Sequence, residues 1–257
     1  MRKALFFDID GTLVSFQTHS IPTSTIDALE RARKNGYLTF ISTGRPRRII
    51  NNLDHLVFDG YITMNGSFCY AGKEQVIYKC PVAAEDVYTL AEIVDREKIT
   101  TVFVTEDEMY IVNPGPDSEQ FSRMLNVPRL PHAGIEQITD KEIFQVSPFF
   151  SQEQENLYMP LLPHSSSGRW HPSFTDIVAA GNCKQRGIDE IIRHFDIPLE
   201  GTMAFGDGGN DISMLRHAGI GVAMGNASEE VKESADYVTA SVDEDGIARA
   251  LSHFNII

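Results

Sequence analysis

Two aspartates two positions apart, Asp8 and Asp10, directly follow an apolar run at residues 4–7. A short apolar run without polar alternation is typical of a strand buried in a parallel sheet, and such sheets bind ligands at the carboxyl ends of their strands. Side chains two apart on a strand project to one side, and Gly11 then allows the chain to turn away. Buried carboxylates need compensation, which a divalent cation provides. The stretch indicates a catalytic metal site, although nucleotide-sugar transferases and solvated acidic turns also contain D-x-D.

A third carboxylate, Asp207, follows another stretch of small and apolar residues and has glycines on both sides. We therefore expect it at the same edge of the sheet as Asp8. Asn210 and Asp211 fall in the first turn of the next expected helix, where a carboxylate suits the helix dipole and an amide can contact an anion. A helix cap explains Asp211 as well as a metal role does, but it does not explain Asp207 and the repeated glycines.

Thr43 and Gly44 follow a strand expected at residues 37–42, and Lys184 precedes a helix expected at 186–195. The first pair would place a hydroxyl and a backbone N–H beside Asp8, with the positive end of a helix beginning at Pro46. For Thr43 a helix cap is an equally good explanation. Carboxylates combined with phosphate-binding groups match Mg²⁺, which prefers few protein carboxylates, several waters and substrate phosphate oxygens.

The elements that must position these residues alternate between strands and helices at both ends of the chain. A helix near residue 23, capped by Thr23 or Ser24, joins the first two expected strands, which implies a right-handed parallel crossover. The middle differs, since the short strands 101–105 and 109–112 are adjacent and helices flank them. Further elements there are helices at 84–98, at 118–125 and from 152, strands at 144–147 and 169–178, and a loop at 163–168. We predict an α/β core made of residues 1–81 and 180–257, with an α+β module at 82–179 inserted in it.

Composition narrows the class of protein. The 257 residues include 22 basic and 36 acidic side chains, so the net charge of −14 argues against a broad nucleic-acid or anionic-membrane surface. The cysteines Cys69, Cys80 and Cys183 have no metal-ligand spacing and are odd in number, which fits a reducing compartment. The N-terminal apolar run is too short for a signal peptide, and no stretch approaches transmembrane length. We expect a cytoplasmic protein, monomeric or weakly dimeric.

Four motifs in this order resemble those of the haloacid dehalogenase superfamily of phosphotransferases: Asp8-x-Asp10-Gly-Thr, Ile41-Ser-Thr43-Gly-Arg45, Lys184, and Gly206-Asp207-Gly-Gly-Asn210-Asp211. The position of the insertion resembles the Cof-type sugar-phosphate phosphatases. The resemblance covers essentially the whole chain and implies a Rossmann-like parallel-sheet core with an inserted α+β cap. The lysine motif departs slightly, because Lys184 lacks the glycine that often follows it.

The resemblance also implies residue roles in hydrolysing small sugar phosphates, hexose phosphates foremost. Asp8 would attack phosphorus and form an aspartyl-phosphate, and Asp10 would act as general acid and then base. The implied Mg²⁺ ligands are Asp8, the backbone carbonyl of Asp10, Asp207, and Asp211 directly or through water. The implied phosphate-binding residues are Thr43, Gly44, Lys184 and Asn210.

The inserted module would be the cap, which closes over the site and selects the substrate. Arg169, Trp170 and His171 are candidates for sugar contacts, although packing of the aromatic on the cap's own core is the favoured interpretation. Arg45 is expected to be an ion-pair partner that holds its loop. Alternatives are a sugar phosphomutase, a receiver-like signalling module whose aspartyl-phosphate is the output, and a non-catalytic sugar-phosphate sensor.

Overall fold

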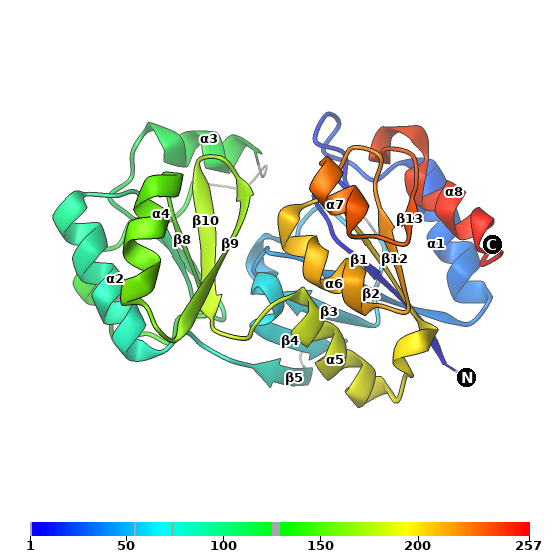
Figure 1. Ribbon diagram of the computed structural model, residues 1–257, viewed down its shortest axis with the longest axis horizontal. Coiled ribbons are helices and arrows are strands. Elements are labelled where there is room, and N and C mark those ends of the chain that lie inside the picture. The colour runs from blue at the N-terminus through cyan, green and yellow to red at the C-terminus, as the bar shows by residue number, and fades with distance from the viewer. Residues whose placement is uncertain (1, 54, 73–74, 125–128) are drawn as a thin grey trace. The chain divides into compact units, whose positions relative to one another are not determined.

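The computed structural model describes residues 2–53, 55–72, 75–124 and 129–257, and the chain forms two compact units (Figure 1). Unit 1 comprises Met1–Gly44, Ile50–Tyr78 and Cys183–Ile257. Unit 2 comprises Arg45–Ile49 and Lys79–Asn182.

Unit 1 is built on an eight-stranded sheet with the order β13-β12-β11-β1-β2-β3-β4-β5. The strands from β13 to β3 pair in parallel, and β4 is antiparallel to β3. The predicted parallel α/β class is therefore confirmed. The strand bounds are β1 Lys3–Phe7, β2 Tyr37–Ser42, β3 Gly60–Thr63, β4 Phe68–Ala71, β5 Gln75–Lys79, β11 Thr202–Gly206, β12 Ile220–Ala223 and β13 Tyr237–Val238.

Helices cover both faces of this sheet. Leu5 and Phe7 of β1 pack in one hydrophobic cluster with α1 and α8, whereas Ala4 and Phe6 pack in a second cluster with α5, α6 and α7. Alternate residues of β1 thus enter opposite layers, which is why the run contains no polar residue. The helices are α1 Thr23–Lys34, α5 Lys184–Phe195, α6 Ile212–His217, α7 Glu229–Glu233 and α8 Gly246–His253.

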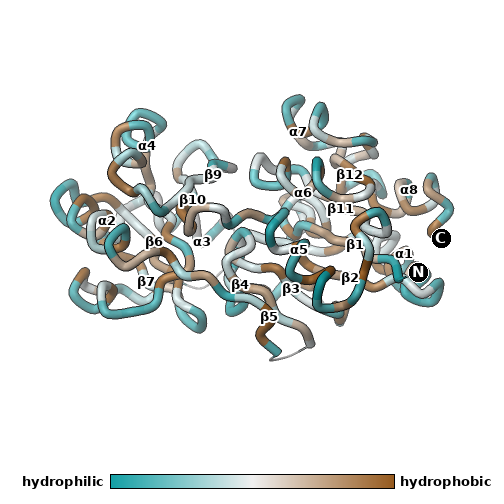
Figure 2. Tube along the Cα trace, turned by 60° about the horizontal axis from the view of Figure 1, so that its bottom comes forward, coloured by the Kyte–Doolittle hydropathy of each residue, from teal (hydrophilic) through white to brown (hydrophobic). Residues whose placement is uncertain are grey.

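Unit 2 has a five-stranded antiparallel sheet with the order β7-β6-β8-β10-β9. Phe103, Val146 and Ile177 pack on one face against α2 and α4, which lie together on that side of the sheet in Figure 1. Figure 2 shows hydrophilic residues on the outer turns of the helices in both units. The elements are α2 Ala84–Glu97, β6 Thr101–Val104, β7 Met109–Val112, α3 Pro116–Met124, β8 Gln145–Pro148, α4 Gln152–Tyr158, β9 Ser165–His171 and β10 Phe174–Ala179.

Four local predictions are wrong. The single strand expected at 169–178 is a hairpin, and β9 also occupies most of the loop expected at 163–168, because the chain turns back between β9 and β10. The N-cap of α1 is Pro22, without a side-chain cap from Thr23 or Ser24. The helix expected from Pro46 is only a single 3₁₀ turn, Arg47–Ile49, so no α-helix points its positive end at the site from there.

Among the described residues, no helix is both long and apolar enough to cross a membrane.

Candidate active site

Asp8 lies at the carboxyl end of β1, in the middle of the unit 1 sheet. Phe7 is in register with Phe205 of β11 and with Ile41 of β2. The Asp8 backbone N–H donates to the Phe205 carbonyl at 3.0 Å, which extends the ladder by one residue. The Asp8 side chain is buried, so its carboxylate is held at a fixed place on the sheet edge.

Lys184 begins α5 and is fully buried, with 0% of its surface exposed. Its Nζ donates to Asp8 Oδ1 at 2.6 Å and to Asp211 Oδ1 at 2.5 Å. Burial alone would lower the pKa of Lys184, but the ion pairs with Asp211 and Asp8 outweigh burial and raise that pKa. The lysine is therefore a permanent cation that joins residues from three separate segments of the chain.

Asp211 also fixes the loop in which it lies. Its Oδ2 accepts hydrogen bonds from the backbone N–H groups of Asp207, at 3.0 Å, and Gly208, at 2.8 Å. One carboxylate thus orders the loop with Oδ2 and contacts Lys184 with Oδ1. Asp211 Oδ2 caps the 3₁₀ turn Gly209–Asp211 through the Gly208 N–H, although Asp211 makes no side-chain capping hydrogen bond to α6. Its contact with Lys184 places Asp211 beside Asp8.

Asp207 is held by two side chains from distant segments. Thr12 Oγ1 donates to Asp207 Oδ1 at 2.8 Å, and Asn226 Nδ2 donates to Asp207 Oδ2 at 3.1 Å. Gly11, at φ +85°, leaves space for this carboxylate, because a Cβ there would lie 2.2 Å from Asp207 Oδ2. Burial and the charge of Asp211 raise the pKa of Asp207 to about 7.

Asp8, Asp207 and Asp211 each place a carboxylate oxygen within 4.8 Å of the others. Burial raises the pKa of Asp8 well above its ordinary value, Lys184 opposes this effect, and the charges of Asp211, Asp207 and Asp10 add to it. A cluster of oxygen donors with an excess of negative charge fits a hard divalent cation such as Mg²⁺. The donor set therefore suits the metal that the sequence implied.

The other predicted site residues lie on loops at the same edge of the sheet. Thr43 is buried directly beyond β2 and donates its backbone N–H to the Ile62 carbonyl at 2.8 Å, with Gly44 next in the chain. Asp10 is half-buried two residues after Asp8, and its charge raises the pKa values of Asp8 and Asp207. Asn210 lies in the 3₁₀ turn Gly209–Asp211 that precedes α6.

Three residues near the site were not named as candidates from the sequence: Thr12, Asn65 and Asn226. Asn65 Oδ1 accepts a hydrogen bond from Asn210 Nδ2 at 2.9 Å. Asn226 Nδ2 also donates to the Gly11 carbonyl at 2.9 Å. Asn65 and Asn226 each follow a strand of the parallel sheet, β3 and β12, so the strand-end rule that identified Asp8 could have identified them.

In unit 2, Arg169 is engaged with its own unit. Its guanidinium pairs with Glu155 at 2.6 Å and donates to the carbonyls of Phe150 and Pro172 at 2.9 and 3.0 Å. His171 stacks on the Phe174 ring with centroids 5.0 Å apart. The Trp170 side chain, also a candidate for a sugar contact, is not among the side chains that the structure describes. Arg45 donates to the Ile49 carbonyl at 2.9 Å and so stabilises its own short turn.

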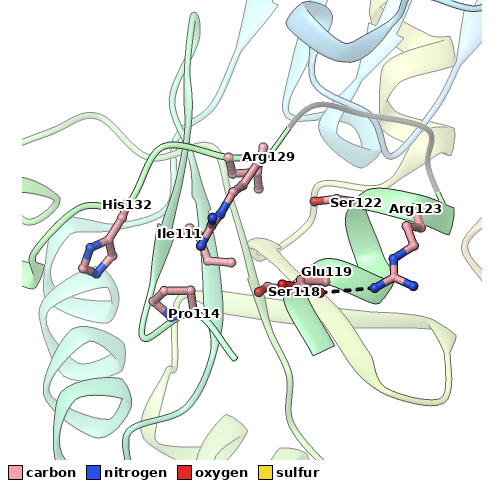
Figure 3. A pocket seen from close by; sticks show the side chains of 9 residues that line it. Ile111, Pro114, Ser118, Glu119, Ser122, Arg123, Arg129 and His132 are labelled. Carbon is pink, nitrogen blue, oxygen red and sulfur yellow. Dashed lines mark hydrogen bonds and ion pairs between the residues drawn. The ribbon is translucent and has the colours of Figure 1, made fainter. Parts of the chain in front are cut away.

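Unit 2 also contains a pocket of about 230 Å³ along α3 and β7 (Figure 3). The Arg129 guanidinium points into it, whereas Arg123 pairs with Glu119 at 3.1 Å. The lining residues include no member of the carboxylate cluster. Its volume exceeds that of several water molecules at about 30 Å³ each, so the pocket has room for part of a small molecule.

Comparisons with known proteins agree on one family. The family model for haloacid dehalogenase-like hydrolases matches residues 5–251. The solved structure of the subclass IIB sugar phosphatase BT4131 of that superfamily is 53% identical, with a TM-score of 0.96 over 99% of this chain and 100% of that chain. A Bacillus subtilis protein named "Putative phosphatase YkrA" is 36% identical over 99% of this chain and 98% of its own length. The Bacillus subtilis 5-amino-6-(5-phospho-D-ribitylamino)uracil phosphatase YitU is 26% identical over 96% and 95%.

Proposed function

Because the chain belongs to the haloacid dehalogenase-like hydrolases and is a phosphatase of that family, we propose that it is a Mg²⁺-dependent enzyme acting on small sugar phosphates, hexose phosphates foremost. The family predicted from the four motifs is confirmed. The observation that carries the finer proposal is the buried Asp8 carboxylate in contact with the buried Lys184 ammonium, beside Asp207 and Asp211. Sugar phosphates are favoured as substrates by the 53% identity to a sugar phosphatase.

Asp8 is the proposed nucleophile. Its carboxylate oxygen would attack the phosphorus and displace the sugar alkoxide, which gives an aspartyl-phosphate that water then hydrolyses. Attack requires a carboxylate to approach a phosphate dianion, and each unit-charge pair repels by about 4 kcal/mol at about 4 Å in an effective dielectric of about 20. Lys184 lies 2.6 Å from Asp8 Oδ1 and offsets part of this repulsion.

Asp10 is the proposed general acid and base. It lies two residues from the nucleophile and is half-buried, so a second carboxyl is close to but distinct from the attacking one. It would protonate the departing alkoxide and then remove a proton from the attacking water.

Mg²⁺ is the proposed cofactor, held by Asp8, the backbone carbonyl of Asp10, Asp207, and Asp211 directly or through water. When bound, it supplies positive charge to the phosphate oxygens. Thr43, Gly44, Lys184 and Asn210 would bind the transferring phosphoryl group, whose loose transition state depends mainly on positioning and charge. Residues 82–179 are proposed to select the substrate's leaving group; because Arg169 is occupied by Glu155, we do not assign it a sugar contact.

A phosphate-release screen over hexose, pentose and nucleotide monophosphates, with Mg²⁺ or with a chelator, tests the proposal. We expect Mg²⁺-dependent release that is fastest with hexose phosphates. Asp8→Asn should abolish turnover and keep the fold, whereas the matched control Asp27→Asn, at an exposed position on α1, should behave as wild type. Activity retained in Asp8→Asn would refute the nucleophile assignment.

A sugar phosphomutase is the second candidate, since the same chemistry can return the phosphoryl group to a sugar. Following isomer formation against free phosphate separates the two activities. A receiver-like module would instead accumulate a long-lived phosphoenzyme and release little phosphate.

A further inference from the structure

A turn that no catalytic motif includes has an unusual backbone. Met64, Asn65 and Gly66 form a 3₁₀ turn after β3 and have consecutive positive φ angles of 50°, 52° and 96°. Left-handed backbone is costly for a residue such as methionine, whereas asparagine and glycine tolerate it better. All three residues are buried, so the surrounding contacts must hold this conformation.

Each part of this turn contacts a different loop of the candidate site. The Asn65 backbone N–H donates to the Thr43 carbonyl at 3.1 Å. The Asn65 side-chain Oδ1 accepts from Asn210 Nδ2 at 2.9 Å. Gly66 packs against the residue before Lys184, because a Cβ at Gly66 would lie 2.2 Å from the Cys183 carbonyl oxygen.

We propose that the turn Met64–Gly66 sets the relative positions of Thr43, Lys184 and Asn210, and that Asn65 is a positioning residue for phosphoryl binding. The proposal rests on the phosphatase function, because those three residues are its phosphate-binding groups. Phosphoryl transfer depends on placement more than on covalent help from the protein. Asn65 acts through the amide of Asn210, whose orientation it fixes with one hydrogen bond.

The test is a double-mutant cycle with Asn65→Gly, Asn210→Ala and the double variant, assayed with an aryl phosphate in Mg²⁺. Glycine keeps the left-handed backbone and removes only the amide. We expect Asn65→Gly to lower kcat/KM about fivefold to tenfold, and to raise the inhibition constant of inorganic phosphate by a similar factor, as the loss of one hydrogen bond would. The double variant should be no worse than Asn210→Ala alone.

Asn255→Gly is the matched control, since Asn255 also has a left-handed φ of 54° but is exposed beyond α8. It should leave kinetics unchanged. If Asn65→Gly matches this control while wild type hydrolyses the aryl phosphate, or if the losses in the cycle multiply, the positioning role is wrong and the phosphatase function stands. A wild type that releases no phosphate from any substrate would overturn both.

Asn65→Asp covers the case in which the glycine variant does not fold. Aspartate keeps the shape and the acceptor oxygen and tolerates the same backbone, but it adds a negative charge beside Asn210. We expect the inhibition constant of inorganic phosphate to rise at least about tenfold, as repulsion near an anion site requires. An unchanged constant with normal thermal stability would overturn the proposal.

Discussion

Replacing Lys184 by methionine should cost more stability than any surface ion pair can account for. The ammonium is fully buried and lies 2.6 Å from Asp8 Oδ1 and 2.5 Å from Asp211 Oδ1. Methionine fills a similar volume but leaves two buried carboxylates without their cation. Breaking a buried pair by removing one partner costs about 3–5 kcal/mol, a large share of a typical total of about 5–15 kcal/mol.

The assay is urea unfolding at pH 7.5 in a chelator, for wild type, Lys184→Met and the control Lys232→Met. Lys232 pairs with Glu229 at 3.0 Å, and the Glu229 side chain is 84% exposed, so this control should cost less than about 1 kcal/mol. Adding Asp8→Asn to Lys184→Met should recover part of the loss, because one uncompensated charge is removed. Equal losses for the two lysine variants would refute the view that Lys184 compensates buried charge.

Three further predictions concern the carboxylate cluster and unit 2. Asn226→Ala should weaken Mg²⁺ binding, measured by calorimetry, about 10–100-fold, because the Asn226 side chain orients the Asp207 carboxylate. An unchanged Kd for Mg²⁺ would contradict this. In the presence of a chelator, the urea concentration at the unfolding midpoint should fall as the pH rises from 5 toward 8. The pKa of Asp207 is raised to about 7 in the folded protein, so in this range the folded state binds a proton that the unfolded state has released, and raising the pH lowers the free energy of unfolding. Mg²⁺ should remove that fall, and a midpoint that rises instead would show the sign to be wrong. Arg169→Met should cost about 3–5 kcal/mol of unfolding free energy, through its largely buried pair with Glu155, and leave aryl-phosphate kcat unchanged; normal stability with a selective loss of sugar-phosphate hydrolysis would favour a substrate contact.

The sequence could predict the strand ends of the site because they follow from local patterns. Apolar runs before Asp8 and Asp207 specify strands buried on both faces, and parallel strands place their carboxyl ends at one edge. Short crossovers explain the pairing of β1 with β2 and of β11 with β12, whereas β1 pairs with β11 across the inserted residues. The location of Asp8 and Asp207 at one edge of the sheet was therefore predictable, whereas Lys184, at the start of α5, was placed beside them by the resemblance of its motif.

The contacts that fix individual side chains were not predictable in the same way. Asn226 reaches Asp207 from a loop beyond β12; the strand-end rule places Asn226 at this edge of the sheet but does not show which side chain it contacts. The hairpin of β9 and β10 is difficult to predict because residues 165–168 have the composition of a loop, which leaves one strand-like stretch at 169–178 interrupted only by Pro172 and Ser173. The Asn226–Asp207 contact depends on the tertiary fold, and in the hairpin the pairing of the two strands overrides the loop-like composition of β9, so local propensity encodes neither feature.

The strand ends were predictable and the side-chain contacts were not, and catalysis depends on both. Sheet register sets backbone positions in steps of about 3.3 Å along a strand and about 4.8 Å between strands, whereas a misplacement of about 1 Å can cost about 100-fold in rate. Strands alone therefore cannot align the proposed phosphate-binding residues Thr43, Lys184 and Asn210 to the accuracy that phosphoryl transfer needs. Buried connections across the loops must supply the remaining accuracy, and the left-handed turn at Asn65 contacts all three loops at once. Because Asn65 is not one of the proposed catalytic, metal-binding or phosphate-binding residues, loss of its side chain should lower the rate of catalysis before it lowers the stability of the fold.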